Sequence, residues 1–293
     1  MKIKFLLMSM VAAMLVSCGT TSTVPITGRK QNLMVSDGEM LSLSTQQYQE
    51  FMKTAKLSTD ATKTAMVKRV GQNLANAVVS YLNANGMQND VQNYKWQFNL
   101  VADKQANAWC MPGGLIVVYE GLLPITQDEA SLAIVLGHEI AHAVARHSAE
   151  QMSQQMKQQY GVQGVSAVAS ILGVGSNTIS LGQAMASAGL NLANLKYSRN
   201  HESEADYMGL IFAAMAGYNP ESAVSFWQRM SSASTSTTAE FLSDHPSDAT
   251  RIKNIQGWLP EAKKYYKPKT TTTAKKTTTT KKKTTTKKTT TKK

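Results

Sequence analysis

The sequence is poor in cysteine, with only Cys18 and Cys110 among its 293 residues. Two cysteines cannot supply the several bridges of a disulfide-rich scaffold, so the fold has to depend on an apolar core. Hydrophobic residues make up 42% of the chain, which is enough for one sizeable core. Cys110 lies in an apolar stretch, and we interpret it as a buried, unreactive thiol.

Acidic residues are absent from residues 263–293, which hold 13 lysines. The rest of the chain has 18 basic and 19 acidic residues, so the formal net charge of +12 belongs to this one segment. The composition therefore gives no support for a basic, nucleic-acid-binding fold. Thr/Lys repeats cannot bury enough apolar surface to offset ordering entropy, so we predict a disordered tail over 263–293. Such a tail can engage an anionic envelope polymer, and the alternative is an inert extension that only aids solubility.

Long apolar runs are also lacking, because the two most apolar stretches fall short of the roughly 20 residues that span a bilayer. The first, Phe5–Val16, follows a basic start and precedes small residues, which predicts a secretory signal peptide over 1–17. The second, 161–190, is interrupted by Gly, Ser and Asn. We favour packed core helices there over a hairpin lying against a membrane.

Leu15-Val16-Ser17-Cys18 resembles the bacterial lipobox, in which the signal is removed before a cysteine that receives diacylglycerol. The resemblance implies that Cys18 is lipidated, and each buried acyl CH2 contributes roughly 0.8 kcal/mol to the anchor. The alternative is an ordinary signal with an incidental cysteine. Gly19 is not the Asp that retains lipoproteins at the inner membrane. We therefore expect the outer membrane, on its periplasmic side.

The remaining chain divides by composition and periodicity. Residues 18–35 are rich in Thr, Ser, Pro and Gly and are predicted to be a tether, followed by one domain over 36–262. Within the domain, apolar residues recur at helical spacing over Glu39–Gly86. Alternating residues predict strands at Trp96–Val101 and Leu115–Tyr119. Further helices are expected over 128–159, 199–216, 221–231 and 247–257.

The run Gly137-His138-Glu139-Ile140-Ala141-His142 carries the strongest chemical signal. At about 100° per residue, His138 and His142 lie on one face of a helix and one turn apart, where two imidazoles can hold the same Zn2+. Glu139 points about 100° away from His138, too far round to be a ligand but able to take a proton from a metal-activated water. A chance match is the alternative, and the capped, apolar helical context makes it less credible.

A catalytic zinc needs a third protein ligand. His147 lies about 180° round an ideal helix from His138, so we predict that it faces elsewhere and is structural. The stretch Ser198–Asp206 is the better source, and its His201, Glu202 and Glu204 remain in competition on spacing alone. Glu202 and Asp206 are four residues apart, so one carboxylate can bind metal while the other orients a histidine ring.

The His-Glu-x-x-His run and the downstream Ser-Arg-x-x-Glu-x-x-Ala-Asp resemble peptidase family M48. The resemblance extends from about Pro25 to Trp258 and includes four further motifs. They are Pro25–Arg29, Asn107-Ala108-Trp109, Pro112-Gly113-Gly114, and His245-Pro246 with Arg251. The family contains HtpX-like and CAAX prenyl endopeptidase-like zinc metalloproteases. Without the transmembrane segments of those branches, the chain is more similar to the lipid-anchored, beta-barrel assembly-enhancing branch. That branch's C-terminal tetratricopeptide repeats are missing here, so docking to the outer-membrane assembly machinery is not implied.

The resemblance implies an α+β, mainly helical gluzincin fold with a small β-sheet beside the active-site helix. It also implies one Zn2+ per chain, held by His138, His142 and Glu202, with Glu139 as the general base. Asp206 would orient a ligand histidine. His245 and Arg251 would lie near the metal, where His245 can fill its open position and either residue can stabilise the oxyanion. An alternative for His245 is a structural residue at a helix entry.

The function implied is a zinc-dependent endopeptidase that hydrolyses misfolded or unassembled envelope proteins. A peptide could bind by strand addition along Asn107–Met111, which reads backbone more than side chains. The rival hypothesis is a binding module or holdase-type chaperone with a structural or latched zinc, which four permanent ligands would favour. A third, a wall-binding or adhesion protein, rests on the tail alone.

Overall fold

The computed structural model describes residues 20–158, 191–233, 245 and 249–268, and it is mainly helical with two small sheets, as the α+β prediction requires. The signal peptide, Cys18, the stretch 161–190 and the tail from residue 269 lie outside these residues. The predicted start of the disordered tail at residue 263 is wrong, because the last helix continues to Tyr265. The main elements are β1 (Thr20–Thr23), β2 (Lys30–Leu33), α2 (Asp37–Thr54), α3 (Ala61–Ala84), α4 (Gln88–Val91), β3 (Gln97–Val101), β4 (Ala108–Met111), β5 (Leu115–Tyr119), α5 (Leu123–Thr126), α6 (Glu129–Val144), α9 (Arg199–Met215), α10 (Ser222–Ala233) and α12 (Ala249–Tyr265).

The larger sheet has three strands in the order β3-β5-β4, with β3 parallel and β4 antiparallel to the central β5. The two strands expected from alternation, β3 and β5, both form, and β4 adds a third between them in the chain. A tight turn connects β4 to β5, and Gly113 and Gly114 have the positive φ values of 91° and 79° that L-residues with a side chain rarely adopt. Strand β4 lies against α6, the helix that carries His138.

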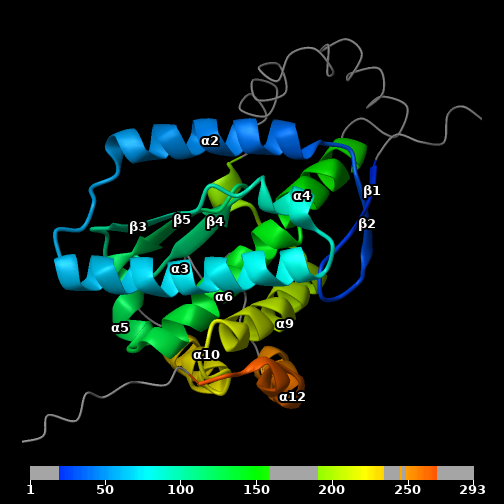
Figure 1. The fold of residues 1–293 in the computed structure, drawn as a ribbon. Helices are drawn as coiled ribbons and strands as arrows, with labels where there is room; N and C mark the ends of the chain where they lie inside the picture. Colours follow the sequence, from blue (N-terminus) through cyan, green and yellow to red (C-terminus); the bar gives the residue numbers. More distant parts are fainter. Residues whose placement is uncertain (1–19, 159–190, 234–244, 246–248, 269–293) are drawn as a thin grey trace, which may run out of the picture.

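Helices cover both faces of this sheet, so the domain has three layers (Figure 1). Phe98, Ile116 and Val118 pack into the larger core with α3, α6 and α9. Trp109 and Val117 point the other way and pack against α2. This alternation follows from the two-residue period of a strand, in which neighbouring side chains face opposite layers.

The periodic stretch expected over Glu39–Gly86 forms two helices, α2 and α3, which begin at side-chain caps. Ser36 accepts a hydrogen bond from the backbone of Glu39 in a capping box, and Asp60 caps α3 by accepting from the backbone of Lys63. The buried side of α3 includes Val67, Val70, Leu74 and Val78, as helical spacing requires.

Helices α6 and α9 cross in close contact, and this crossing positions the candidate site (Figure 1). A Cβ on Gly137 would lie 2.7 Å from the backbone oxygen of Gly209, and a Cβ on Gly209 would lie 2.6 Å from the backbone nitrogen of His138. Both distances are shorter than a van der Waals contact, so glycine at both positions lets the two backbones approach. The close approach brings the acidic first turns of α9 beside the histidines of α6.

The tether predicted over residues 18–35 is wrong from Thr20 onward. Strands β1 and β2 form an antiparallel hairpin, and the loop between them returns to the domain. Val24 and Val35 are buried at 1% and 4% exposure, because apolar residues scattered among Thr, Ser and Gly have found places in the two cores. The folded domain therefore begins well before the predicted boundary at residue 36.

The helix predicted to continue to residue 159 is also wrong in one respect. Helix α6 ends at Val144, and the chain turns at Ala145 and Arg146 before it becomes helical again at His147. Arg146 has a φ of 56°, which costs a non-glycine residue some backbone strain. Asp37 and Asp90 hold its guanidinium at 2.8–2.9 Å and keep the turn in place. No helix in the described part of the chain is both long and apolar enough to cross a membrane.

Candidate metal centre

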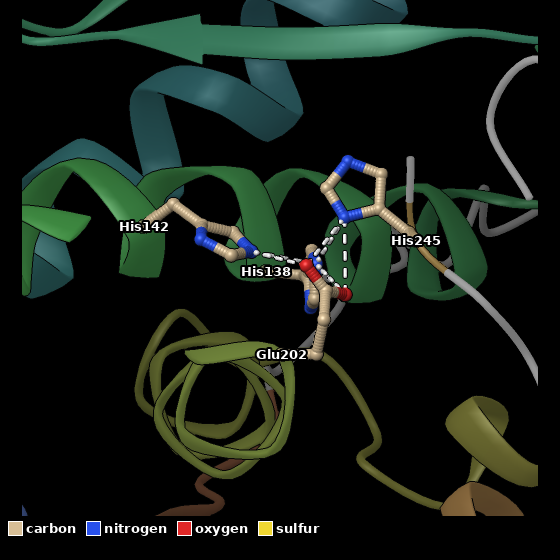
Figure 2. Close-up of side chains that lie close together, drawn as sticks. All are labelled: His138, His142, Glu202 and His245. Carbon is tan, nitrogen blue, oxygen red and sulfur yellow. Dashed lines mark hydrogen bonds and ion pairs between the residues drawn. The ribbon is translucent and has the colours of Figure 1, made fainter. Parts of the chain in front are cut away.

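Four buried side chains bring one ligand atom each to a common point beneath the sheet. Figure 2 shows them pointing toward one another: His138 and His142 from α6, Glu202 from α9, and His245 from the segment before α12. The four ligand atoms all lie within 4.8 Å of one another. His138, His142 and Glu202 are the three residues that the family resemblance implies as ligands, and His245 joins them.

The distances between the ligand atoms of this cluster suit tetrahedral coordination of one ion. His138 Nε2 lies 3.0 Å from His142 Nε2 and 3.4 Å from Glu202 Oε2, and His245 Nδ1 lies 3.0 Å from Glu202 Oε1. A tetrahedron with zinc–ligand distances of about 2.0–2.1 Å has edges of roughly 3.3 Å. Three imidazole nitrogens and a carboxylate oxygen also form a donor set that zinc prefers. The residues present therefore fit a zinc ion.

Glu139 lies beside this cluster without being part of it. Its Oε1 is buried and accepts no hydrogen bond from the described residues, and the nearest ring nitrogen, His245 Nε2, lies 3.6 Å away. Burial raises the pKa of Glu139, although the neighbouring His245 and His138 lower it in part. A carboxylate with a raised pKa and an unused oxygen is suited to accept a proton and pass it on.

The ring of His138 is held on its other side by Asp206. His138 Nδ1 lies 2.9 Å from Asp206 Oδ1, and Arg251 contacts the same carboxylate, with its Nη2 2.7 Å from Oδ1. The guanidinium of Arg251 lies 3.5 Å above the ring of Trp227, as a cation–π pair. This contact with Asp206 supports a positioning role for Arg251, where the sequence had left oxyanion stabilisation open.

The ring of His142 is held by different residues. Tyr197 stacks on it with ring centroids 4.1 Å apart, and the Tyr197 hydroxyl pairs with the Ser148 hydroxyl at 2.8 Å. His142 Nδ1 lies 2.9 Å from His147 Nδ1. The prediction that His147 faces away from the site is therefore wrong, because the turn at Arg146 rotates the chain after α6.

A polar network extends outward from His147. Its Nε2 lies 3.0 Å from Glu204 Oε2, and Glu204 accepts hydrogen bonds from Arg29 Nε at 2.8 Å and from the Thr27 hydroxyl at 2.6 Å. Arg29 also forms a bidentate pair with Glu150 at 2.7 and 2.9 Å. The network therefore connects the β1–β2 loop to the metal cluster.

Burial and charge separate the two histidines of α6. Burial lowers the pKa of His138, but hydrogen bonds to Asp206 and Glu202 outweigh it and raise the pKa to about 9. Burial lowers the pKa of His142 well below its usual value, and Glu202 only partly opposes this. Burial also lowers the pKa of His147, to about 4, so His147 is neutral near pH 7.

The structure distinguishes the three candidates for the third metal ligand, His201, Glu202 and Glu204, which spacing had left open. Glu202 points into the cluster, whereas Glu204 faces His147 and Arg29. His201 stacks on His147 and its Nε2 contacts Glu150 at 3.2 Å, away from the cluster. Sequence reasoning missed Tyr197, Trp227 and Arg29. Only Arg29 carried a signal, because it lies in the Pro25–Arg29 motif of the family resemblance.

Residues 61–259 match the model of a known family, described as peptidase family M48. The chain belongs to peptidase family M48. The peptidases of this family use zinc, and the cluster of His138, His142, Glu202 and His245 could hold that ion. The matched range includes the whole cluster and Glu139, whereas Arg29 lies outside it.

Curated relatives come from mitochondria and from bacteria. The chain is 34% identical over 172 residues to the mitochondrial metalloendopeptidase OMA1 of Schizosaccharomyces pombe, covering 58% of this chain and 48% of that one. It is 27% identical to the metalloprotease LoiP of Escherichia coli, over 87% of this chain and 96% of LoiP. A putative beta-barrel assembly-enhancing protease of Vibrio cholerae is 28% identical over 61% of this chain and 37% of its own length. The chain thus spans about half the length of the Schizosaccharomyces pombe relative.

Proposed function

We propose that this protein is a zinc-dependent endopeptidase of the bacterial cell envelope that hydrolyses misfolded or unassembled envelope proteins. The observation that carries the proposal is the buried placement of Glu139 beside a four-atom ligand cluster. A structural zinc site has no use for a buried carboxylate with an unused oxygen next to it. A peptidase needs such a carboxylate to handle protons.

In this proposal His138, His142 and Glu202 hold the ion. When bound, zinc polarises the scissile carbonyl and lowers the pKa of water, so that a nucleophile forms near neutral pH. Glu139 would accept a proton from that water as it attacks the carbonyl and would deliver the proton to the leaving amine. Asp206 holds His138 through its Nδ1–H and keeps Nε2 directed at the cluster, and Arg251 keeps Asp206 ionised and in place.

Substrate binding is proposed at strand β4, which is an edge strand of the three-stranded sheet. An extended peptide can add to such an edge through backbone hydrogen bonds. Recognition of this kind depends little on side chains, which supports a protease for unfolded clients. The names of two bacterial relatives, a metalloprotease and a putative beta-barrel assembly-enhancing protease, are compatible with such a role.

The decisive experiment is proteolysis of an unfolded outer-membrane protein and of a defined peptide by Glu139→Gln protein. Glutamine keeps the shape of Glu139 but cannot accept the proton, so cleavage should fall by at least about a hundredfold. Zinc content should stay at one ion per chain. Glu50→Gln makes the same chemical change on the exposed surface of α2 and serves as the matched control. Unchanged turnover in Glu139→Gln protein would reject the enzyme class.

Localisation is proposed from the lipobox-like sequence at Cys18. Cys18→Ala should prevent acylation and move the mature protein from the membrane fraction to the soluble one. Sedimentation of the substituted protein with outer membranes would contradict the anchor.

His245 supports a second candidate, a closed zinc site in a binding module or holdase-type chaperone. Its Nδ1 lies 3.1 Å from His138 Nε2, in the position that a catalytic site keeps open for water or substrate. His245→Ala distinguishes the two candidates. A peptidase keeps its zinc on the three remaining ligands, whereas a closed structural site loses both zinc and thermal stability.

A further inference from the structure

The turn after α6 places His147 where an ideal helix would not. Five residues of regular helix would rotate His147 about 140° away from His142. Instead the left-handed Arg146 bends the chain, and the two Nδ1 atoms lie 2.9 Å apart. His147 has no exposed side-chain surface, so the contact forms in a fully buried setting.

The direction of this hydrogen bond follows from the cluster. His142 directs Nε2 toward His138 and Glu202, so a metal there takes the Nε2 lone pair and the ring proton stays on Nδ1. His142 Nδ1–H then donates to His147 Nδ1, which leaves the proton of neutral His147 on Nε2. That Nε2–H donates to the Glu204 carboxylate at 3.0 Å. Each N–H in this series of hydrogen bonds, from His142 through His147 to Glu204, therefore has an acceptor.

The far end of the chain is fixed by the hairpin loop. Arg29 and Thr27 both donate to Glu204, and neither residue belongs to an element that carries a metal-cluster residue. Glu150 holds the two other nitrogens of Arg29, so the guanidinium has a single orientation. The loop between β1 and β2 thus fixes the acceptor on which His147 depends.

We propose that His147 and Glu204 act as a positioning relay for His142, and that Arg29 of the β1–β2 loop fixes its outer end. The inference rests on the proposed function, because it takes His142 as a zinc ligand. The relay holds the Nδ1–H tautomer of His142 and keeps Nε2 directed at the ion. Without it His142 can take the other tautomer, whose Nε2–H cannot bind a metal.

The test is the Zn2+ dissociation constant of the full-length chain, measured by competition with a chelator, together with the visible spectrum of its Co2+ form. His147→Phe removes the acceptor and should weaken Zn2+ binding about 10–100-fold and alter the Co2+ spectrum. His147→Asn returns an acceptor near the Nδ1 position and should recover part of the affinity. A role in folding alone would not produce this recovery.

His201→Phe is the matched control. It replaces another buried histidine of the same network with the same residue, and the ring still stacks on His147, but His201 makes no ring contact with His142. We expect wild-type Zn2+ affinity and an unchanged Co2+ spectrum. Wild-type affinity in His147→Phe protein would overturn the relay. So would equal losses in the His147→Phe and His201→Phe proteins.

The relay and the proposed function can fail separately. If wild-type protein binds Zn2+ and His147→Phe weakens it, but no peptide is cleaved, the relay stands and the peptidase does not. If Glu139→Gln abolishes cleavage while His147→Phe keeps full Zn2+ affinity, the peptidase stands and the relay does not. If His147→Phe protein does not fold, Glu204→Gln tests the relay in its place, because wild-type affinity and an unchanged Co2+ spectrum there would also overturn the relay.

Discussion

His138 and His142 lie one turn apart on α6, yet the contacts that support them end toward opposite termini, at Arg251 for His138 and at Arg29 for His142. His138 is held in one step by Asp206, with Arg251 behind it, and both residues lie within the range matched by the family model. His142 is held in two steps, by His147 and then Glu204, and the network ends at Arg29 outside that range. The first support is short and fully buried, whereas the second is long and reaches the surface. Two proposed ligands with the same helical geometry therefore depend on different parts of the molecule.

The largest loss of zinc should come from removing the proposed ligands, and it should be equal for His138 and His142. His138→Ala and His142→Ala each remove a nitrogen from the cluster, so each protein should retain little zinc by elemental analysis. Glu202→Ala should behave alike, because it removes the only carboxylate of the cluster. Full zinc occupancy in any of the three would contradict the ligand assignment.

The next largest effect should be on the free energy of unfolding, which should fall more when the support of His138 is broken than when that of His142 is broken. Arg251→Gln removes the guanidinium from its buried ion pair with Asp206, and breaking a buried pair of this kind costs about 3–5 kcal/mol. Arg29→Gln should cost less, since the Arg29 side chain is 34% exposed and water can reach its partners. Urea denaturation of both metal-free proteins measures the difference. An equal loss would show that the outer network is as important to the fold as the inner one.

A smaller effect, on Zn2+ affinity, should follow when the carboxylate in each support, Asp206 or Glu204, is replaced by a neutral amide. Asp206→Asn acts directly on His138 and should weaken Zn2+ binding about 10–100-fold. Glu204→Gln acts only through His147, so its effect should be measurable but stay below about tenfold. Chelator competition gives both values on the same scale. A larger loss for Glu204→Gln would reverse the order of the two supports.

The smallest effect should follow deletion of residues 267–293. Arg251 lies in α12, which ends at Tyr265, so the cut leaves both supports complete. Zinc content and peptide cleavage should be unchanged, while salt-sensitive binding to envelope preparations should fall, since 11 lysines are removed. Loss of cleavage would show that the tail belongs to the catalytic unit.

The sequence predicted the parts of the molecule that depend on local spacing. Apolar periodicity predicted the helices, and alternation of apolar and polar residues predicted strands β3 and β5. The four-residue spacing of His138 and His142 placed them on one helical face before any tertiary contact was known. Each of these features is decided within a few residues, where backbone geometry leaves few alternatives.

Only the tertiary structure decided which residues meet the histidines. His201, Glu202 and Glu204 were equivalent by spacing, and the crossing of α6 and α9 through Gly137 and Gly209 selected Glu202. Composition predicted a tether where Val24 and Val35 are in fact buried in the two cores, because burial depends on the residues that the rest of the chain packs against them. A regular helix would direct His147 away from His142. In the structure Arg146, which has a positive φ and is held by Asp37 and Asp90, bends the chain and brings His147 back to His142. The strained turn at Arg146 is stabilised by residues that are far from it in sequence, so no local sequence pattern could predict it.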